Sequence, residues 1–448
     1  MRILFINVSK YFGNRVYREY PLGAGMLATI VQNAGYKVKL YDMAVEENSV
    51  IEIVSEFEPD IIGLSYSSAG AHTAYGLIKS LKSKTSAVLI AGGIHPTLYY
   101  EEALNNGIDF VVVGEAENVI LPLIDNIEKS RKLINNDFDN FSGIAYWNKD
   151  SIKYKKQSET VDLNELPFVN RDLFNMKHYT YHSILSSRGC IHQCMFCSSK
   201  GLAGCLPRMS APERIISEIE FLACKYGKIN LYWADDMFFH DHAARIRFCN
   251  LLIQKKLPVQ YVIQLRADNI NDELMIALKQ SGCIKVAFGA ESGSNEILKT
   301  IKKDITAETI ENAIICAKKN QLRIKTWWIV GLPGTYDQQL EALKIIKLTY
   351  PNEVAIHIFA PLPGSDFWDE ADKYGIHLPE SLQKLELLGY YTNPDEIHLD
   401  YLSTGELRAL ISIYEQELSN YGYIPTDRSE GDEEYIYTTP NQKKTFRV

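Results

Sequence analysis

The stretch "SSRGCIHQCMFC", residues 186–197, places Cys190, Cys194 and Cys197 within eight positions, although the preceding 189 residues contain no cysteine. With eight cysteines in 448 residues, the number of C-x-x-x-C-x-x-C matches expected by chance is about 0.003. Zinc sites prefer four protein ligands, or three and water, and often use paired C-x-x-C turns; Cys205 lies nearby, but no second pair accompanies it. Three thiolates on a four-iron cluster leave one iron open for chemistry. The stretch therefore favours a 4Fe-4S cluster over structural zinc.

From this stretch onward, six apolar runs alternate with segments of helical periodicity, which predicts a partial parallel (β/α)6 TIM-like barrel over residues 181–365. The runs are 183–189, 229–236, 259–266, 284–292, 324–334 and 353–364. Active sites of such barrels lie at the carboxyl ends of the strands. Polar and small residues gather at these positions: Asp235, Asp236, Arg266, Asp268, Gly289, Glu291, Gly293, Gly331, Pro333 and Gly334.

The first 130 residues alternate five buried strand-like runs with amphipathic stretches, which predicts a doubly wound, Rossmann-like parallel sheet covered on both faces. Small residues follow the strands: Pro21, Leu22, Gly23, Gly25, Ser65, Ser67, Ser68, Gly92, Gly93, Gly114 and Glu115. Four loops of low bulk indicate a broad, flat ligand that the backbone approaches closely. No G-x-G-x-x-G occurs, which weakens an NAD or FAD assignment. His95 is expected to make a hydrogen bond rather than to bind a metal.

Two further regions complete the predicted α/β organisation. Residues 131–180 read as a connector strap containing a small hairpin around Asn148–Ser151. Residues 366–448 read as a small helical region with a loose tail from residue 426 onward. The aromatic residues Tyr232, Trp233, Trp327 and Trp328 are candidates to line a pocket, but adjacent Trp327 and Trp328 must point to opposite faces of a strand. Cys224, Cys249, Cys283 and Cys316 lie in helix or core patterns and read as buried apolar residues.

Composition narrows the functional class. The chain is 46% hydrophobic with a net charge of −9, and it shows no basic stripe, so nucleic acid is not an expected partner. The apolar runs are shorter than the ~20 residues of a membrane span. The opening "MRILFINVS" lacks the pattern of a signal peptide. Clustered thiols in a large chain without a disulfide pattern indicate a reducing compartment, so a cytoplasmic location is expected.

The segment "CIHQCMFC", with Phe196 before its last cysteine, resembles the radical S-adenosylmethionine motif. The loops "YPLGAGMLA", "LSYSSA", "AGGIHPT" and "VVVGEAE", with the strap "LPFVNRDLF", resemble cobalamin-dependent members of that family, and the resemblance covers roughly residues 1–365. It implies that the three cysteines hold the cluster. It implies S-adenosylmethionine near Phe196, Asp235, Asp236, Arg266, Glu291, Gly331 and Pro333. It implies cobalamin near Leu22, Gly23, Ser65, Ser67, Gly92, Gly93, Gly114 and Glu115. No D-x-H-x-x-G occurs, so the resemblance does not imply a histidine beneath cobalt.

The resemblance also implies an activity. A 5′-deoxyadenosyl radical abstracts substrate hydrogen, and methylcobalamin donates a methyl group, so we expect a class B C-methyltransferase. Its partners would be a small-molecule or natural-product-type substrate and a one-electron reductant of the flavodoxin or ferredoxin type. One alternative is a cyclase or oxidoreductase resembling the anaerobic magnesium-protoporphyrin monomethyl ester cyclase. A methylthiotransferase is disfavoured because the N-terminal region lacks a second cysteine trio. A non-catalytic cobalamin sensor would need only the first domain.

Overall fold

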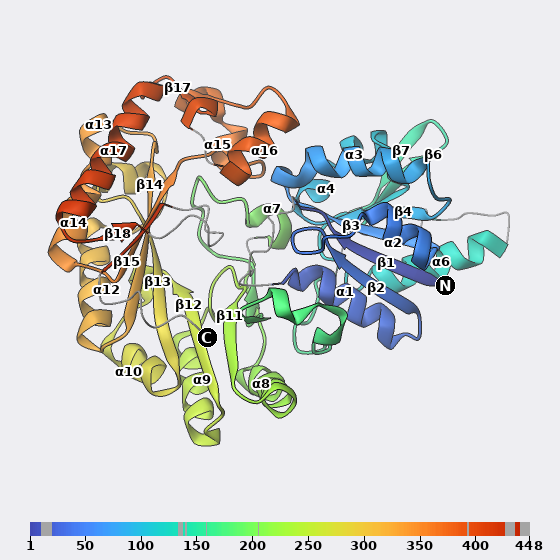
Figure 1. Ribbon diagram of the computed structural model, residues 1–448, viewed down its shortest axis with the longest axis horizontal. Coiled ribbons are helices and arrows are strands. Elements are labelled where there is room, and N and C mark those ends of the chain that lie inside the picture. The colour runs from blue at the N-terminus through green and yellow to red at the C-terminus, as the bar shows by residue number, and fades with distance from the viewer. Residues whose placement is uncertain are drawn as a thin grey trace. The chain divides into compact units, whose positions relative to one another are not determined.

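A computed structural model describes residues 1–9, 20–132, 138, 141–157, 159–204, 206–391, 394–425 and 435–439. The chain forms two compact units (Figure 1). The first unit comprises residues 1–180 together with 199–204 and 381–386. The second comprises residues 181–198, 205–380 and 387–448.

The first unit contains a seven-stranded sheet in the order β2-β1-β3-β4-β5-β6-β7. Its strands are β1 Arg2–Asn7, β2 Lys37–Asp42, β3 Ile61–Ser65, β4 Val88–Gly92, β5 Phe110–Val112, β6 Ile144–Asn148 and β7 Ser151–Tyr154. The first five strands are parallel in a doubly wound order, which confirms the predicted class and puts the switch point between β1 and β3. The hairpin expected in the connector pairs antiparallel with β5 and so extends this sheet.

Helices cover both faces of this sheet because its strands are apolar on both sides. Ile3 and Phe5 of β1 pack into one core with α1 and α6, whereas Leu4 and Ile6 pack into another with α2, α3 and α5. This division follows from the two-residue period of a strand. The helices are α1 Leu22–Asn33, α2 Val50–Phe57, α3 Ala71–Lys82, α4 Ile94–Leu98, α5 Tyr100–Asn105, α6 Ile120–Lys132 and α7 Lys200–Ala203.

Within the connector strap, residues 161–180 pack against α1. Phe174 stacks at 4.6 Å, centroid to centroid, on Tyr20, and a Cβ added at Gly25 would lie 2.5 Å from the Phe174 ring. The buried Arg171 donates from Nε to the Tyr20 hydroxyl at 2.8 Å. Tyr179 donates to the Asp42 carboxylate at 2.7 Å. The strap is therefore an integral part of the first unit's core.

The second unit contains an eight-stranded sheet in the order β18-β19-β15-β14-β13-β12-β11-β8. Six strands of this sheet, β8, β11, β12, β13, β14 and β15, are parallel, which confirms the predicted partial barrel. The sheet strands are β8 His182–Ile184, β11 Ile229–Trp233, β12 Val259–Leu265, β13 Cys283–Glu291, β14 Arg323–Val330, β15 Glu353–Ile358, β18 Ile424–Pro425 and β19 Tyr435–Thr438. Two short pairs, β9 Ser187–Arg188 with β10 Arg208–Met209 and β16 Ile376–His377 with β17 His398–Leu399, lie outside it.

Helices on the outer face of this sheet bury a large aromatic and aliphatic core. Trp233 of β11 packs edge-on against Phe238 and Phe248, with ring centroids 4.7 and 5.2 Å away. The helices of the second unit are α8 Pro212–Tyr226, α9 His242–Lys255, α10 Asp272–Gln280, α11 Asn295–Thr300, α12 Ala307–Lys319, α13 Tyr336–Gln339, α14 Ala342–Thr349, α15 Asp366–Asp369 and α17 Thr404–Asn420. Helix α16, Leu382–Tyr391, begins in the segment that belongs to the first unit. Trp233 and Trp328 thus belong to the core rather than to a pocket.

The expectation of a loose tail is wrong for part of the C-terminal segment. Residues 435–438 form β19, which pairs antiparallel with β15, and Tyr437 is buried. An edge strand offers unpaired backbone groups, and a β-rich sequence satisfies them by pairing. Residues 426–434 and 440–448 of the predicted tail lie outside the described residues. The helical prediction holds for α17, where Ser403 and Glu406 form a capping box.

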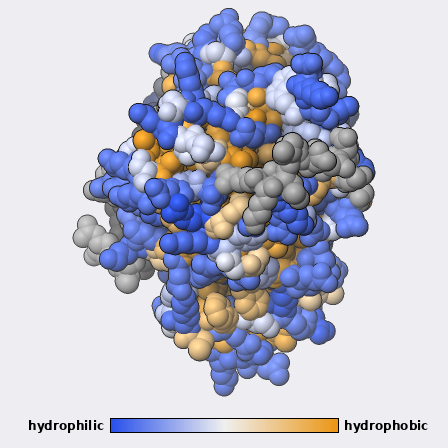
Figure 2. Space-filling model, turned by 90° about the vertical axis from the view of Figure 1, so that its right-hand side faces the viewer, coloured by the Kyte–Doolittle hydropathy of each residue, from blue (hydrophilic) through white to orange (hydrophobic). Residues whose placement is uncertain are grey.

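The surface fits the charged composition. The face in Figure 2 is mostly hydrophilic, with smaller apolar areas between polar side chains. Among the helices that the structure describes, none is both long enough and apolar enough to cross a membrane.

Gly25→Ala tests the contact between the strap and α1. The added methyl group would lie 2.5 Å from Phe174, so overpacking should lower the free energy of unfolding by about 1–3 kcal/mol. Gly76→Ala in α3 is the matched control because its Cβ would meet nothing within 4 Å. It should raise stability by about 0.5–1 kcal/mol. Urea unfolding of the full chain measures both, and equal effects would contradict the packing argument.

Candidate active site

The three clustered cysteines occupy a loop that follows β9. Cys194 is buried, Cys190 and Cys197 are half-buried, and all three thiols are free. Between them, the fully buried Met195 fixes the loop: its N–H donates to the carbonyl of Ile301, and its carbonyl accepts from the N–H of Phe367, both at 3.0 Å. An apolar anchor therefore holds the loop while the cysteines on either side remain available to a ligand.

Asp235 and Asp236, just after β11, bind the segment that leads into this loop. Asp235 Oδ1 accepts from the backbone N–H of Ser186 at 2.6 Å and of Ser187 at 3.2 Å, and its Oδ2 accepts from the Ser186 hydroxyl. Asp236 Oδ2 accepts from the N–H of Gly189 at 2.9 Å. The two carboxylates join the carboxyl end of a barrel strand to the start of the cysteine loop.

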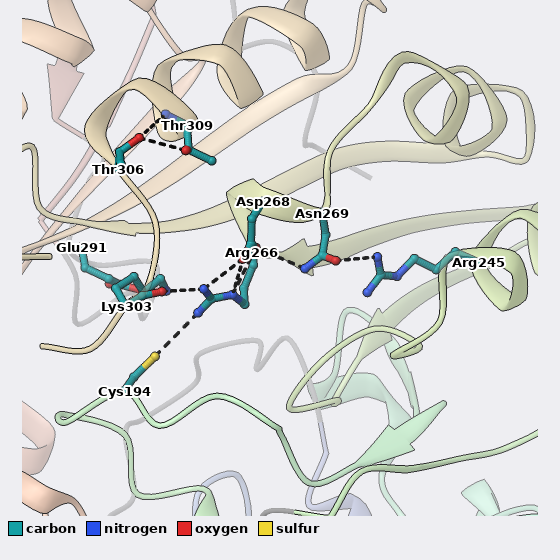
Figure 3. A network of polar contacts seen from close by, with 9 residues as sticks. All are labelled: Cys194, Arg245, Arg266, Asp268, Asn269, Glu291, Lys303, Thr306 and Thr309. Carbon is teal, nitrogen blue, oxygen red and sulfur yellow. Dashed lines mark hydrogen bonds and ion pairs between the residues drawn. The ribbon is translucent and has the colours of Figure 1, made fainter. Parts of the chain in front are cut away.

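Arg266, at the end of β12, also points toward the loop (Figure 3). Its guanidinium donates from Nη1 to the Cys194 sulfur at 3.7 Å and from Nη2 to the carbonyl of Lys303 at 2.5 Å. Asp268 binds Nε and Nη2 of the same group at 3.2 and 3.1 Å. Arg266 therefore touches a cysteine directly, and Asp268 fixes its orientation.

Glu291 ends β13 in a strained conformation. Its φ of 63° is left-handed, and the register with β14 shifts between Gly289 and Glu291. A Cβ at Gly289 would lie 2.4 Å from the Glu291 carboxylate, so a larger residue there would displace that side chain. The carboxylate accepts from Lys303 Nζ at 2.8 Å, and Nζ lies 5.8 Å from the Phe196 ring centroid. The bulge thus aims Glu291 toward the region of the cysteine loop.

Gly331, after β14, has both backbone polar groups occupied. Its N–H donates to the Gln339 side chain at 3.0 Å, and its carbonyl accepts from the Tyr401 hydroxyl at 2.9 Å. Its φ of 96° requires glycine. Pro333 is half-buried two residues later. These bonds hold the turn and occupy the N–H and the carbonyl of Gly331. A ligand at this position would therefore contact the turn by packing rather than by hydrogen bonds to Gly331.

The donor set fits an iron–sulfur cluster better than a single ion. Among the described residues, no group of three or more His, Cys, Asp or Glu side chains is arranged to hold one metal ion. A four-iron cluster presents separate iron corners, so its thiolate ligands need not converge on one point. Burial raises the pKa of Cys194, but Lys303 and Arg266 act in the opposite direction. The two cations therefore favour a negatively charged sulfur at this position.

In the first unit, the predicted small residues lie at the carboxyl ends of the parallel strands. A Cβ at Gly23 would meet nothing within 4 Å, and one at Gly92 would meet only the Val112 carbonyl at 4.0 Å. Gly93 has a φ of 97°, and its Cβ would lie 2.9 Å from the Tyr66 carbonyl. Ser65 ends β3, Ser67 precedes a 3-10 turn at Ser68–Gly70, and Leu22 begins α1. The bare backbone at Gly23 and Gly92 fits a flat ligand such as a corrin.

Three other predicted residues have contacts within the unit. Glu115 accepts from the N–H of Val161 at 3.3 Å and so binds the strap. Gly114, with a φ of 93°, donates its N–H to Thr97 at 3.0 Å. The Nδ1 atom of the buried His95 lies 3.1 Å from the Ser68 hydroxyl. Burial lowers the pKa of His95, so it supports the loops as a neutral side chain.

Four residues of the site, Lys303, Ser186, Gln339 and Tyr401, were not predicted from the sequence. Each contacts a predicted residue through the fold: Gln339 lies 8 residues from Gly331, Lys303 lies 12 from Glu291, and Tyr401 lies 70 from Gly331. None belongs to a recognisable motif. Of the aromatic candidates, Trp327 is half-buried with Lys325 Nζ 5.1 Å from its ring, and Tyr232 accepts from Gln264 at 2.7 Å.

Comparisons with known proteins agree with this geometry. Residues 8–123 match the family model of the B12 binding domain, and residues 184–345 match that of the radical SAM superfamily. An uncharacterized methyltransferase of Pyrococcus horikoshii is 28% identical over 88% of this chain and 87% of its own length. The anaerobic magnesium-protoporphyrin IX monomethyl ester cyclase of Rubrivivax gelatinosus is 26% identical over 87% of this chain and 75% of its own length.

Among solved structures, the radical S-adenosylmethionine methyltransferase TsrM of Kitasatospora setae has a similar fold. Its TM-score is 0.70 at 16% identity, covering 85% of this chain and 77% of TsrM. A B12 binding domain thus precedes a radical SAM domain in this chain. The chain belongs to the cobalamin-dependent radical S-adenosylmethionine enzymes.

Asp235→Asn should change how stability depends on pH. Burial raises the pKa of Asp235 from 3.8 to about 7, although hydrogen bonds from Ser186 and Ser187 lower it. Between these pH values the folded chain keeps a proton that the unfolded chain has lost, so this group stabilises the fold at low pH and loses that effect as pH rises through 7.

Urea unfolding of the cluster-free chain between pH 5 and 8 measures this slope. The asparagine variant should show a shallower decline of stability with pH than the wild type. Asp372→Asn, at an exposed position of the second unit, controls for the change in charge. Parallel curves for wild type and Asp235→Asn would refute the assignment.

Proposed function

We propose that this protein is a class B C-methyltransferase acting on a small molecule. When bound, the cluster with S-adenosylmethionine supplies a radical that removes a hydrogen atom, and cobalamin supplies a methyl group. Cys190, Cys194 and Cys197 would hold the cluster. The observation that carries the proposal is the cysteine loop at the carboxyl end of a partial barrel, with Arg266 donating to Cys194.

The surrounding residues divide into two roles under this proposal. Glu291 and Phe196, whose positions flank Lys303, would contact S-adenosylmethionine together with the turn at Gly331 and Pro333. Asp235, Asp236 and Arg266 would instead hold the cysteine loop, because their polar atoms already bind it. Glu115 would likewise hold the strap rather than cobalamin, whereas Gly23, Gly92 and Gly93 would face the cofactor.

Two relatives support different outcomes for the radical. The relative from Pyrococcus horikoshii is named as a methyltransferase, and the one from Rubrivivax gelatinosus as a cyclase. We favour methyl transfer because the TsrM structure, which shares this fold over 85% of the chain, is also described as a methyltransferase. Cyclisation is the second candidate. Either reaction requires a one-electron reductant of the flavodoxin or ferredoxin type.

Replacing each of Cys190, Cys194 and Cys197 by alanine should abolish cluster assembly, because two thiolates do not retain a four-iron cluster. Iron and sulfide analysis with EPR after anaerobic reconstitution measures the loss. Formation of 5′-deoxyadenosine under dithionite should disappear as well. Cys224→Ala, on an exposed face of α8, is the control and should keep both. A cysteine variant that forms as much 5′-deoxyadenosine as the wild type would contradict the assignment of the three cysteines as cluster ligands.

A labelled methyl group separates the two reactions before the substrate is known. The cobalamin-loaded protein is reduced and supplied with S-adenosylmethionine carrying a ¹³C methyl group, and the extracted cobalamin is then analysed by mass spectrometry. A methyltransferase should load the label onto cobalamin. A cyclase should form 5′-deoxyadenosine and leave cobalamin unlabelled. A protein that forms neither but retains cobalamin would be a sensor.

A further inference from the structure

The guanidinium of Arg266 is held in one orientation. It is 9% exposed, and Asp268 binds it along one edge, with Nε–Oδ1 and Nη2–Oδ2 distances of 3.2 and 3.1 Å. Nη2 also donates to the Lys303 carbonyl at 2.5 Å. These contacts leave Nη1 directed at the Cys194 sulfur, 3.7 Å away, as Figure 3 shows. A forked pair of this kind fixes direction as well as position.

Lys303 brings a second cation to the same place. It is 5% exposed, pairs with Glu291 at 2.8 Å and lies over the ring of Phe196, which precedes Cys197. The carboxylate of Asp268 is more open to solvent than the arginine it binds, with side-chain exposures of 33% and 10%. Solvent therefore screens the negative partner more than the positive one.

We propose that Arg266, oriented by Asp268 and Lys303, raises the reduction potential of the cluster through its hydrogen bond to Cys194. This inference rests on the proposed function, in which Cys194 is a cluster ligand. In the step concerned, the oxidised cluster takes one electron from an external reductant, and no bond forms or breaks. The added negative charge is stabilised by a donor to sulfur and by nearby positive charge, the factors that set potentials of iron–sulfur clusters. Arg266 is thus a positioning and charge-setting residue.

The test is a redox titration of the anaerobically reconstituted full chain, without S-adenosylmethionine, followed by EPR. In Arg266→Met, the ratio of reduced to oxidised cluster at a fixed potential should fall at least tenfold. That change equals a downward shift of about 59 mV for a one-electron couple. Arg266→Lys keeps the positive charge but loses the paired guanidinium hydrogen bonds to Asp268, so its shift in midpoint potential should be smaller.

Lys285→Met is the matched control. Lys285 is also an ion-paired cation of the second unit, half-buried and 3.0 Å from Glu353, but it lies near the amino end of β13 whereas Glu291 ends that strand. Its variant should leave the midpoint potential unchanged. A shift in Lys285→Met equal to that in Arg266→Met would overturn the inference, because it would reflect total charge alone.

Equal iron and sulfide content with an unchanged midpoint in Arg266→Met would also overturn it. If Arg266→Met fails to assemble a cluster, Lys303→Met takes its place. That variant removes the second cation but keeps the backbone carbonyl that orients Arg266, so the midpoint potential of the cluster should fall. An unchanged midpoint potential would again refute the inference. A wild-type chain that assembles no cluster would overturn the proposed function as well, which separates the two failures.

Discussion

The hydrogen bonds between the carboxyl end of β11 and the segment before Cys190 set the geometry on which the site depends. A loop carrying three cysteines offers little apolar surface, and Met195 is its one fully buried side chain among residues 190–197. Its conformation therefore depends on polar contacts in addition to the apolar anchor at Met195. Asp235 and Asp236 supply them by accepting backbone N–H groups of Ser186, Ser187 and Gly189. Burying the Asp235 carboxyl group costs stability, as its raised pKa indicates, and a well-defined loop offsets that cost.

A second constraint is the balance of charge around the loop. Arg266 and Lys303 lie close to Cys194, and each is paired with a carboxylate, so the site contains no large net charge. Buried cations without such partners would carry a heavy desolvation penalty. Pairing also fixes their direction. The left-handed backbone of Glu291 shows that the fold accepts local strain to complete this arrangement.

Most of the fold, and part of the site, follow from local sequence patterns. The alternation of buried runs and amphipathic stretches gave the parallel strands of both units, and cysteine spacing located the loop. Lys303 could not be found in this way, because its role arises from a tertiary contact with Glu291 and a backbone contact with Arg266. The β19 strand was missed for a related reason. Its charged surroundings resemble a tail, and only the unpaired edge of β15 makes pairing favourable.

Polar residues at strand ends therefore need to be divided by what they bind. Asp235, Asp236 and Glu115 share the composition of ligand-binding groups, but their oxygen atoms accept from the chain's own backbone. Gly23 and Gly92 carry no functional group, yet they leave open space where a ligand can approach the backbone. Carboxylates thus stiffen loops in both units, whereas in the first unit glycines expose the backbone. Strand-end position alone predicts where a site lies, whereas the hydrogen-bond partners decide which residues meet the ligand.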